Sequence, residues 1–307
     1  MSKGSYYRGS GLLFRSDIAL DDFAPAEPGP PDVVIETGPQ AAQAAERAEE
    51  QSWAYGGFQI SPDGPVIAVP GIAAYLITEG RHIAVSPAPN AAPGLMRLYL
   101  MGSALGMVFH QRGQLILHGA AVARGGALTL FTGPSGAGKS TLAAHLARRD
   151  YPVLGDDTLP LTTGSDDLPM AYPGARMFKL CEDAALRLSD TPLPRLAPDY
   201  GKVLFKNIAP AAYHALPLAE IVLLERGEGP AALHAIQGLQ AVAMIAQNTY
   251  RPEYLGLLGT EARHFEQVAA LSTHVRCYRL QRPWEPDRIE ESLDVLEAHW
   301  RDAGSLG

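Results

Sequence analysis

A glycine-rich segment near the middle of the chain has the residue types and spacing of a phosphate-binding loop. The residues that fit the pattern G-x-x-x-x-G-K-[ST] are Gly133, Gly138, Lys139 and Ser140. Residues 127–132 form a short apolar run that predicts a strand, and residues 139–149 have the apolar spacing of a helix. The alternative is a glycine turn that happens to precede Lys-Ser. We disfavour it because the pattern, the strand and the helix agree.

Such a loop binds polyphosphate through bare backbone. Glycine lets the loop N–H groups and the N-terminus of the following helix approach an anion closely. Lys139 is then expected to reach the β- and γ-phosphates, and the Ser140 hydroxyl is expected to ligate Mg²⁺. We therefore predict a site for a nucleoside triphosphate. The residues predicted to form it are Gly133, Pro134, Ser135, Gly136, Ala137, Gly138, Lys139, Ser140 and Thr141.

Two adjacent carboxylates, Asp156 and Asp157, follow a short predicted strand at 152–154. Acids at the carboxyl end of a strand next to the loop can reach Mg²⁺ directly or through water. One member of such a pair can stay a metal ligand while the other accepts a proton from a substrate. The alternative is a solvated turn, where Asp is common. Beside a phosphate-binding loop we favour the functional interpretation.

A histidine and a set of cations are further candidates. His118 lies on the strand predicted before the loop strand, and a hairpin joining the two would bring it towards the loop. The alternative is an ordinary core or surface histidine. Phosphoryl transfer gains from a cation over the developing negative charge. The arginines and lysines considered for this role are Arg176, Lys179, Lys202, Lys206 and Arg251. Of these we select Arg251, on its spacing.

Two regions of different character must position these residues. Residues 1–91 look β-rich and are interpreted as a recognition or packing domain. Residues 92–307, which open with a helix at 93–113, alternate strands and helices and predict an α/β domain. Residues 40–51 predict a solvated helix or loop. The other strands are expected at 6–14, 32–36, 73–78, 81–86, 115–123, 220–225, 233–236 and 275–280, and the other helices at 239–248, 260–271 and 286–300.

Composition excludes several classes of protein. The 307 residues are 47% hydrophobic and 19% charged, which is ordinary for a globular protein. A net charge of −8 leaves no basic face for nucleic acid. The longest apolar run, 98–109, is too short to span a bilayer, and the N-terminus has no secretory signal. Cys181 and Cys277 form no metal-binding motif, so we expect two reduced, buried thiols in a cytoplasmic protein.

The order of these motifs resembles that of the HPr kinase/phosphorylase family. Members have a histidine-glycine strand, a phosphate-binding loop and an acid pair, and the matching residues here are His118-Gly119, 133–140 and 155–157. The chain is more similar still to the HPr-kinase-like proteins associated with lasso-peptide biosynthesis. The segments that carry this second likeness are 11–20, 98–106 and 110–113.

The resemblance implies a phosphoenolpyruvate-carboxykinase-like α/β kinase core that uses ATP and Mg²⁺. It implies a serine acceptor, on a small carrier protein in HPr kinases and at the C-terminus of a precursor peptide in the lasso-associated kinases. Lys139 would bind phosphate and Ser140 the metal, while His118 would contact or orient the transferring phosphate. Asp156 would be the base and Asp157 the metal ligand, with the reverse assignment left open. A homo-oligomer is compatible with the resemblance.

The chain departs from the family pattern at two places. Gly155 stands where alanine is usual before the acid pair. Arg251 resembles the arginine of the family's Val-Arg-Pro-Gly-Arg-Asn stretch, but residues 250–254 read Tyr-Arg-Pro-Glu-Tyr here. That signature accompanies HPr binding and the phosphorylase reaction in the family. Its loss argues against HPr as the partner and against reverse phosphorolysis.

We therefore predict an ATP- and Mg²⁺-dependent kinase that phosphorylates a serine hydroxyl of a peptide or small protein. Two alternatives stay open: an ATP-binding switch or scaffold with weak hydrolysis, and a kinase of a small molecule such as free serine. The acid pair favours transfer over the switch, because a pure sensor needs no base beside an acceptor. The β-rich region disfavours a small acceptor, which requires no additional domain.

Overall fold

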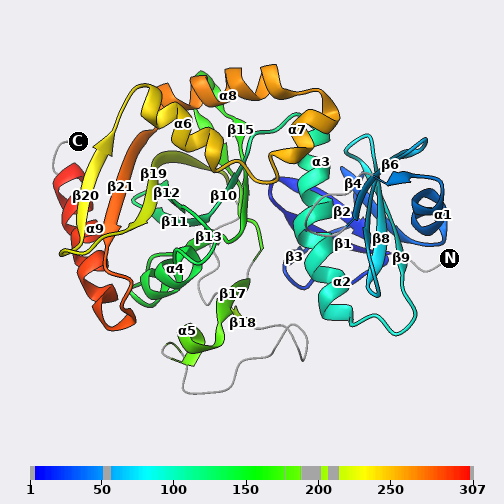
Figure 1. The fold of residues 1–307 in the computed structure, drawn as a ribbon, viewed down its shortest axis with the longest axis horizontal. Coiled ribbons are helices and arrows are strands. Elements are labelled where there is room, and N and C mark those ends of the chain that lie inside the picture. Colours follow the sequence, from blue (N-terminus) through cyan, green and yellow to red (C-terminus); the bar gives the residue numbers. More distant parts are fainter. Residues whose placement is uncertain are drawn as a thin grey trace. The chain divides into compact units, whose positions relative to one another are not determined.

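Strands and helices alternate along the chain in the computed structural model (Figure 1). It describes residues 4–50, 57–175, 177–186, 188, 202–206 and 214–304. Contacts divide the described residues into two units. The first holds the residues up to 116 together with 251–260, and the second holds 117–250 and the residues from 261 onward. The architecture is mixed α/β with several sheets, as the sequence predicts.

A nine-stranded sheet forms most of the first unit, in the order β3-β1-β2-β4-β9-β8-β7-β6-β5. The strands are β1 Ser5–Gly9, β2 Leu12–Ser16, β3 Ala24–Pro25, β4 Val33–Thr37, β5 Glu49–Glu50, β6 Gly57–Ser61, β7 Gly64–Val69, β8 Ala73–Thr78 and β9 His82–Pro87. The predicted hairpin of 73–86 is confirmed, since β8 and β9 pair antiparallel. The single strand predicted at 6–14 is wrong. Ser10 and Gly11, with φ of 49° and 82°, turn the chain between β1 and β2.

The helix α1 (Gln40–Glu46) confirms the helix alternative for residues 40–51 but corrects the expectation that this segment is solvated. Ala41 and Ala44 are fully buried and pack in one cluster with Val66, Leu76 and Ala84 of the sheet. Methyl side chains make a weak apolar stripe in the sequence, but they let a helix lie close against a sheet. The prediction that this segment is solvated was wrong because it relied on large apolar residues, whereas alanines form the buried face.

One long helical segment runs from Pro93 to Gln111, confirming the predicted helix and its proline in the first turn. It comprises α2 (Pro93–Tyr99), a π-helical turn at Leu100–Ala104 and α3 (Leu105–Gln111). Tyr75 Oη on β8 donates to the Met96 carbonyl at 2.7 Å, and α7 (Glu253–Leu258) packs against α3. These contacts place residues 92–116 in the first unit. The domain boundary predicted from the sequence lies earlier, between residues 91 and 92, and it stays a prediction about which segments fold independently.

An eight-stranded sheet forms the centre of the second unit. Its order is β13-β11-β12-β19-β16-β15, with β21 beside β19 and β20 beside β21. The strands are β11 Ala120–Arg124, β12 Ala127–Thr132, β13 Val153–Gly155, β15 Thr162–Thr163, β16 Pro169–Ala171, β19 Leu216–Arg226, β20 Ala232–Ile236 and β21 Arg276–Arg282. The strands β12, β19 and β21 run parallel, so their carboxyl ends meet at one edge of the sheet. The predicted strands at 127–132, 220–225, 233–236 and 275–280 are confirmed.

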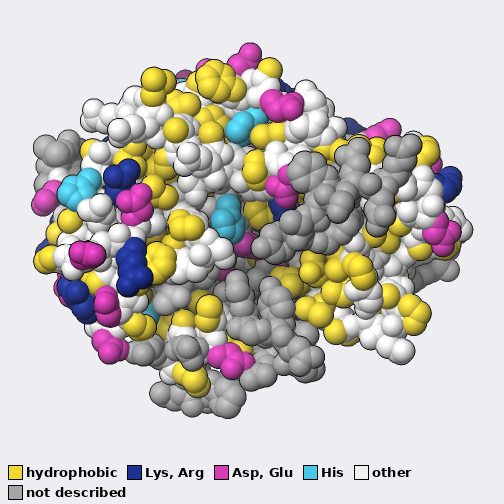
Figure 2. Space-filling view, viewed as in Figure 1, with side chains coloured by type: hydrophobic (Ala, Val, Ile, Leu, Met, Phe, Trp, Pro, Cys, Tyr) yellow, Lys and Arg dark blue, Asp and Glu magenta, His cyan; other side chains and the backbone are white. Residues whose placement is uncertain are grey.

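Two helices bury their apolar sides in the core of this sheet. They are α4 (Lys139–Arg148), directly after β12, and α9 (Ile289–Gly304). The predicted apolar face of α9 is confirmed, since Ile289, Leu293, Leu296 and Trp300 are each 6% exposed or less. Figure 2 shows Lys and Arg side chains interspersed with Asp and Glu on the surface that carries β20, β21 and α9. That surface therefore has mixed charge.

A buried carboxylate connects the strands of this sheet to α9. Glu220 on β19 is 0% exposed. It accepts hydrogen bonds of 3.2 Å from Thr129 Oγ1 and Trp300 Nε1, and it lies 2.9 Å from Arg276 Nη2 and 3.2 Å from His299 Nε2. A carboxylate in this position is tolerated because it is surrounded by hydrogen-bond donors and cations.

The remaining elements surround these cores. They are β10 Ile116–His118, β14 Thr158–Pro160, β17 Met177–Cys181, β18 Lys202–Lys206, α5 Glu182–Leu186, α6 Leu239–Gln247 and α8 Glu261–His274, with 3-10 turns at Ser165–Asp167 and Pro286–Arg288. Of the two cysteines, Cys277 is buried as expected, but Cys181 at the end of β17 is exposed, so that prediction is wrong. No helix among the described residues has the length and apolar character needed to cross a bilayer.

Candidate functional site

The loop between β12 and α4 has the backbone that its glycines predict. Gly133, Gly136 and Gly138 have φ values of 139°, 84° and 87°, which side-chain-bearing residues rarely adopt. At Gly133 space is limiting as well, because an added Cβ would lie 2.9 Å from the Leu224 carbonyl oxygen of β19. The loop therefore follows closely along the neighbouring strand and opens into the first turn of α4.

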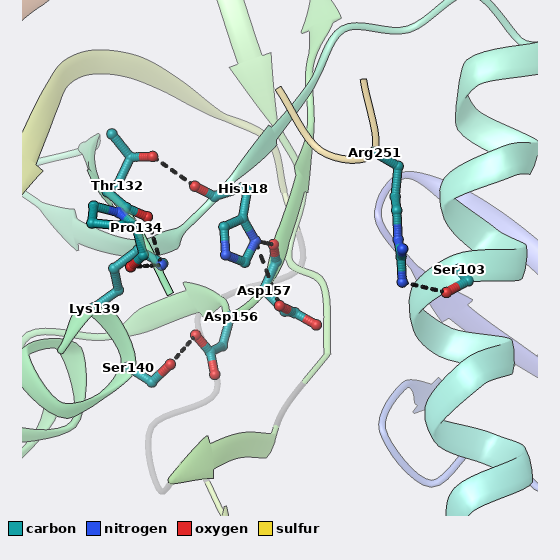
Figure 3. Close-up of polar contacts among 10 residues, drawn as sticks. Ser103, His118, Thr132, Pro134, Lys139, Ser140, Asp156, Asp157 and Arg251 are labelled. Atoms are coloured by element: carbon teal, nitrogen blue, oxygen red, sulfur yellow. Dashed lines mark hydrogen bonds and ion pairs between the residues drawn. The ribbon is translucent and has the colours of Figure 1, made fainter. Parts of the chain in front are cut away.

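Lys139, the first residue of α4, folds back over the loop (Figure 3). Its side chain is 8% exposed, and its Nζ donates to the carbonyl oxygens of Gly133 at 2.8 Å and Pro134 at 3.1 Å. The ammonium group and the positive end of the helix dipole thus lie at the same loop. Together they form an anion-attracting position in a chain whose net charge is −8.

Ser140 and Asp156 are brought together beside this loop (Figure 3). The Ser140 hydroxyl donates to Asp156 Oδ1 at 2.8 Å, and Asp156 is 8% exposed. Asp156 follows β13, which pairs with β11, and β11 in turn pairs with the loop strand β12. The predicted approach of the acid pair to the loop through a neighbouring strand is therefore confirmed for Asp156.

The donor set at Ser140 and Asp156 fits Mg²⁺. This cation prefers oxygen ligands and commonly takes one or two protein groups, with phosphate oxygens and water completing its shell. In the part of the chain that the structure describes, no cluster of three or more His, Cys, Asp or Glu side chains is placed to bind a metal alone. Ser140 and Asp156 therefore offer two oxygen ligands of the kind that Mg²⁺ takes from proteins.

His118 and Asp157 form the second pair of the site (Figure 3). His118 Nδ1 lies 2.8 Å from the Asp157 carbonyl oxygen and 3.5 Å from its Oδ1. Since a carbonyl can only accept, the proton of a neutral His118 is assigned to Nδ1, and Nε2 carries the lone pair. Both side chains are about one-third exposed, at 31% and 34%. The pair is therefore accessible to solvent.

The chain fixes His118 through its backbone. The His118 N–H donates to the Asn248 carbonyl at 2.8 Å, and its carbonyl accepts from Thr132 Oγ1 at 2.7 Å. The strand predicted at 115–123 is interrupted at Gly119, between β10 and β11, and an added Cβ at this position would lie 2.3 Å from the Phe131 carbonyl oxygen. The predicted hairpin of β11 and β12 forms, and it places His118 beside the end of the loop strand.

Arg251 belongs to the first unit. Its Nη2 donates to Ser103 Oγ at 2.9 Å (Figure 3). Its Nη1 lies 3.4 Å from Glu253 Oε1. A role for Arg251 at the phosphates stays a prediction. Arg176, the other arginine considered, lies outside the described residues, as do the side chains of Lys179, Lys202 and Lys206.

The sequence analysis missed a cation that the fold brings to the loop. Arg282, the last residue of β21, is 7% exposed, and its Nη2 donates to the Ala137 carbonyl oxygen at 3.3 Å. Because 145 residues separate the two partners, no local pattern links them. The signal that could have found Arg282 is its position just after the strand expected at 275–280, because ligands of α/β domains bind at the carboxyl ends of strands.

Comparisons with known proteins add little to this geometry. No family model and no curated protein matches the sequence. Among solved structures, the chain is similar to the HPr(Ser) kinase/phosphatase from Coxiella burnetii, with 11% identity over 62% of this chain and 93% of that chain, and a TM-score of 0.34. A likeness at that TM-score carries no conclusion about the fold or function of this chain.

Proposed function

We propose that the chain is an ATP- and Mg²⁺-dependent phosphotransferase that phosphorylates a serine hydroxyl of a peptide or small protein. The observation that carries the proposal is the Ser140–Asp156 hydrogen bond of 2.8 Å at the first turn of α4, beside a glycine loop that Lys139 folds over. A hydroxyl and a carboxylate in contact at the end of such a loop are the protein ligands that phosphoryl transfer requires for its metal.

The loop and Lys139 bind the phosphates in this proposal. The N–H groups at the start of α4 would donate hydrogen bonds to the polyphosphate. The Lys139 ammonium would leave the loop carbonyl oxygens that it contacts now and bind the β- and γ-phosphate oxygens instead. Ser140 and Asp156 would hold Mg²⁺, which when bound offsets the negative charge of the phosphates. Asp156 is thereby assigned to the metal, the reverse of the first assignment implied by the resemblance.

Asp157 is the proposed base. Its carboxylate is partly exposed, so it can meet a hydroxyl brought by another molecule, and it accepts the proton that the hydroxyl loses as the phosphate is transferred. His118 donates Nδ1–H to the Asp157 backbone and holds its ring beside that carboxylate. His118 therefore orients the pair and lies where its ring can contact the transferring phosphate.

The acceptor is proposed from the sequence resemblance alone. The motif order His118-Gly119, loop and acid pair resembles kinases of protein or peptide serines. The C-terminal serine of a lasso precursor peptide is the specific acceptor that the second resemblance suggests. Free serine and HPr are the competing acceptors. A switch that binds ATP without an acceptor is the competing function.

Mass spectrometry of candidate acceptors tests the proposal. The protein is incubated with ATP, Mg²⁺ and each of three acceptors: HPr, free serine and the peptide encoded nearest its gene. We expect a gain of about 80 Da on a serine of the peptide. The matched control is Lys139→Ala, which should give no product while its circular dichroism spectrum stays that of the wild type. Hydrolysis of ATP without any phosphorylated acceptor would contradict the kinase proposal and favour the ATP-binding switch.

A further inference from the structure

Arg282 is a buried cation at the loop to which neither the motif nor the acid pair assigns a role. It ends β21, whose register beside β19 brings it to the carboxyl edge of the parallel strands. Its own carbonyl accepts from the Gly227 N–H at 2.9 Å, so the backbone at this position is fixed. The guanidinium contacts the loop directly, because an added Cβ on Gly138 would lie 2.6 Å from Arg282 Nη2.

The charge of Arg282 is poorly compensated by the protein. The single side-chain hydrogen bond that it makes among the described residues is the one to the Ala137 carbonyl, and its buried Nε has no hydrogen-bond partner there. Burial lowers the pKa of the guanidinium. A buried cation normally has a carboxylate partner or a bound anion, since desolvation is costly. Within the same described residues, no carboxylate forms an ion pair with Arg282.

We propose that Arg282 is a second phosphate-binding cation of the loop and that the α- and β-phosphates of a bound nucleotide supply its counter-charge. This inference rests on the proposed function, because it requires a polyphosphate in the loop. The position along the loop selects these phosphates. The guanidinium lies against Ala137 and Gly138, part of the backbone that surrounds the α- and β-phosphates in such loops, whereas Lys139 reaches towards the γ-phosphate.

A purely structural arginine makes the opposite prediction. If Arg282 only supports the loop through Ala137, its removal lowers the stability of the nucleotide-free protein and leaves phosphate affinity intact. If it is an uncompensated cation awaiting an anion, its removal leaves that stability unchanged or raises it, and affinity falls. The two roles therefore predict different changes in the stability of the nucleotide-free protein, and only the phosphate-binding role predicts a loss of phosphate affinity.

The experiment measures nucleotide affinity and thermal stability in Arg282→Met, with Arg279→Met as the control. Arg279 lies on the same strand but is 40% exposed and pairs with Glu225. Isothermal titration with pyrophosphate, ADP and ATP should show binding weakened about tenfold or more for all three ligands in Arg282→Met and little change in the control. The melting temperature without ligand should be equal to the wild-type value or higher. Arg282→Gln, which keeps polar donors but no charge, repeats the test if the Met variant fails to fold.

Unchanged affinity in a folded Arg282 variant would overturn the inference while leaving the proposed function standing. So would a loss confined to ATP, because that result assigns the contact to the γ-phosphate. A wild-type protein that binds none of the three ligands would instead overturn the proposed function, and the inference with it.

Discussion

Asp156 and Asp157 are neighbours in the sequence that face different partners. Asp156 follows the extended strand β13 and contacts Ser140, whereas Asp157 has a left-handed φ of 79° and lies against His118. Asp adopts that backbone region more readily than most residues. The change of backbone region between the two residues separates the carboxylate that contacts Ser140, our proposed metal ligand, from the one that lies against His118, our proposed base.

The division of labour predicts different defects for the two asparagine variants. Asp156→Asn should raise the Mg²⁺ concentration needed for half-maximal transfer by about tenfold or more, since it removes a charged ligand. Asp157→Asn should lower kcat by about 10²- to 10⁴-fold and leave ATP affinity unchanged, since it removes the proton acceptor. Transfer rates measured over a Mg²⁺ series check both. A wild-type kcat in Asp157→Asn would exchange the two roles.

Gly119 sets the position of His118 by its lack of a side chain. Gly119→Ala places a Cβ 2.3 Å from the Phe131 carbonyl oxygen, so backbone must shift. We expect the free energy of unfolding to fall by about 1–3 kcal/mol and transfer to fall with it, as His118 moves. Urea unfolding checks the first effect. Gly229→Ala is the matched control and should be nearly neutral, because its added Cβ meets nothing within 4 Å.

At the scale of the elements, Glu220 makes the position of α9 depend on β19. Its carboxylate contacts Trp300 and His299 of α9 as well as side chains of β12 and β21. Removing this charge weakens the acceptor of buried donors and leaves the partly exposed Arg276 without its counter-charge. The sheet and the helix should therefore weaken together.

The corresponding prediction compares two glutamates of one strand. Glu220→Gln should lower the free energy of unfolding by about 1–3 kcal/mol, because it weakens the hydrogen bonds that buried donors make to this carboxylate. Glu225→Gln should change it by less than about 1 kcal/mol, because Glu225 is partly exposed and pairs with the partly exposed Arg279. Chemical denaturation of both variants gives the comparison. Equal losses of unfolding free energy in the two variants would show that the contacts of Glu220 contribute no additional stability.

Elements whose signals are local could be predicted from the sequence. The strand and helix around the loop follow from short-range spacing, and the face of α9 follows from apolar residues that recur every three to four positions. Features set by distant partners could not. The Gly119 break depends on Phe131, the burial of α1 on three strands, and the place of Arg282 on the register of β21. In the site, the sequence motifs identified Ser140 and Asp156 as candidates. Their contact could not be predicted, because it depends on the strand order β13-β11-β12.

At the scale of the whole molecule, the two thiols report on the integrity of the second unit. Cys181 is exposed, while burial raises the pKa of Cys277 from its ordinary value of 9.0 to about 11. The thiolate is the reactive form. We expect Ellman's reagent at about pH 8 to label one thiol in the native protein and two in urea. Rapid labelling of both thiols in native protein would contradict the burial of Cys277.

The same thiol makes stability depend on alkaline pH. Between 9.0 and about 11 the unfolded chain releases the Cys277 proton while the folded chain retains it. The contribution is thus complete below that window and is lost as pH rises through it. The free energy of unfolding should fall across the window more steeply in the wild type than in Cys277→Ala, a comparison that removes the titration of other groups. Parallel slopes would contradict the assignment.

The return of residues 251–260 to the first unit has a consequence for synthesis on the ribosome. The nine strands of that unit are translated early, but α7, which packs against α3, is made only after residues 117–250 have been added. At about 5–20 residues per second, adding these residues takes roughly 7–27 seconds. Nascent chains therefore carry an unfinished first unit through much of their translation. A message truncated between codons 117 and 250 leaves that unit permanently without its last helix.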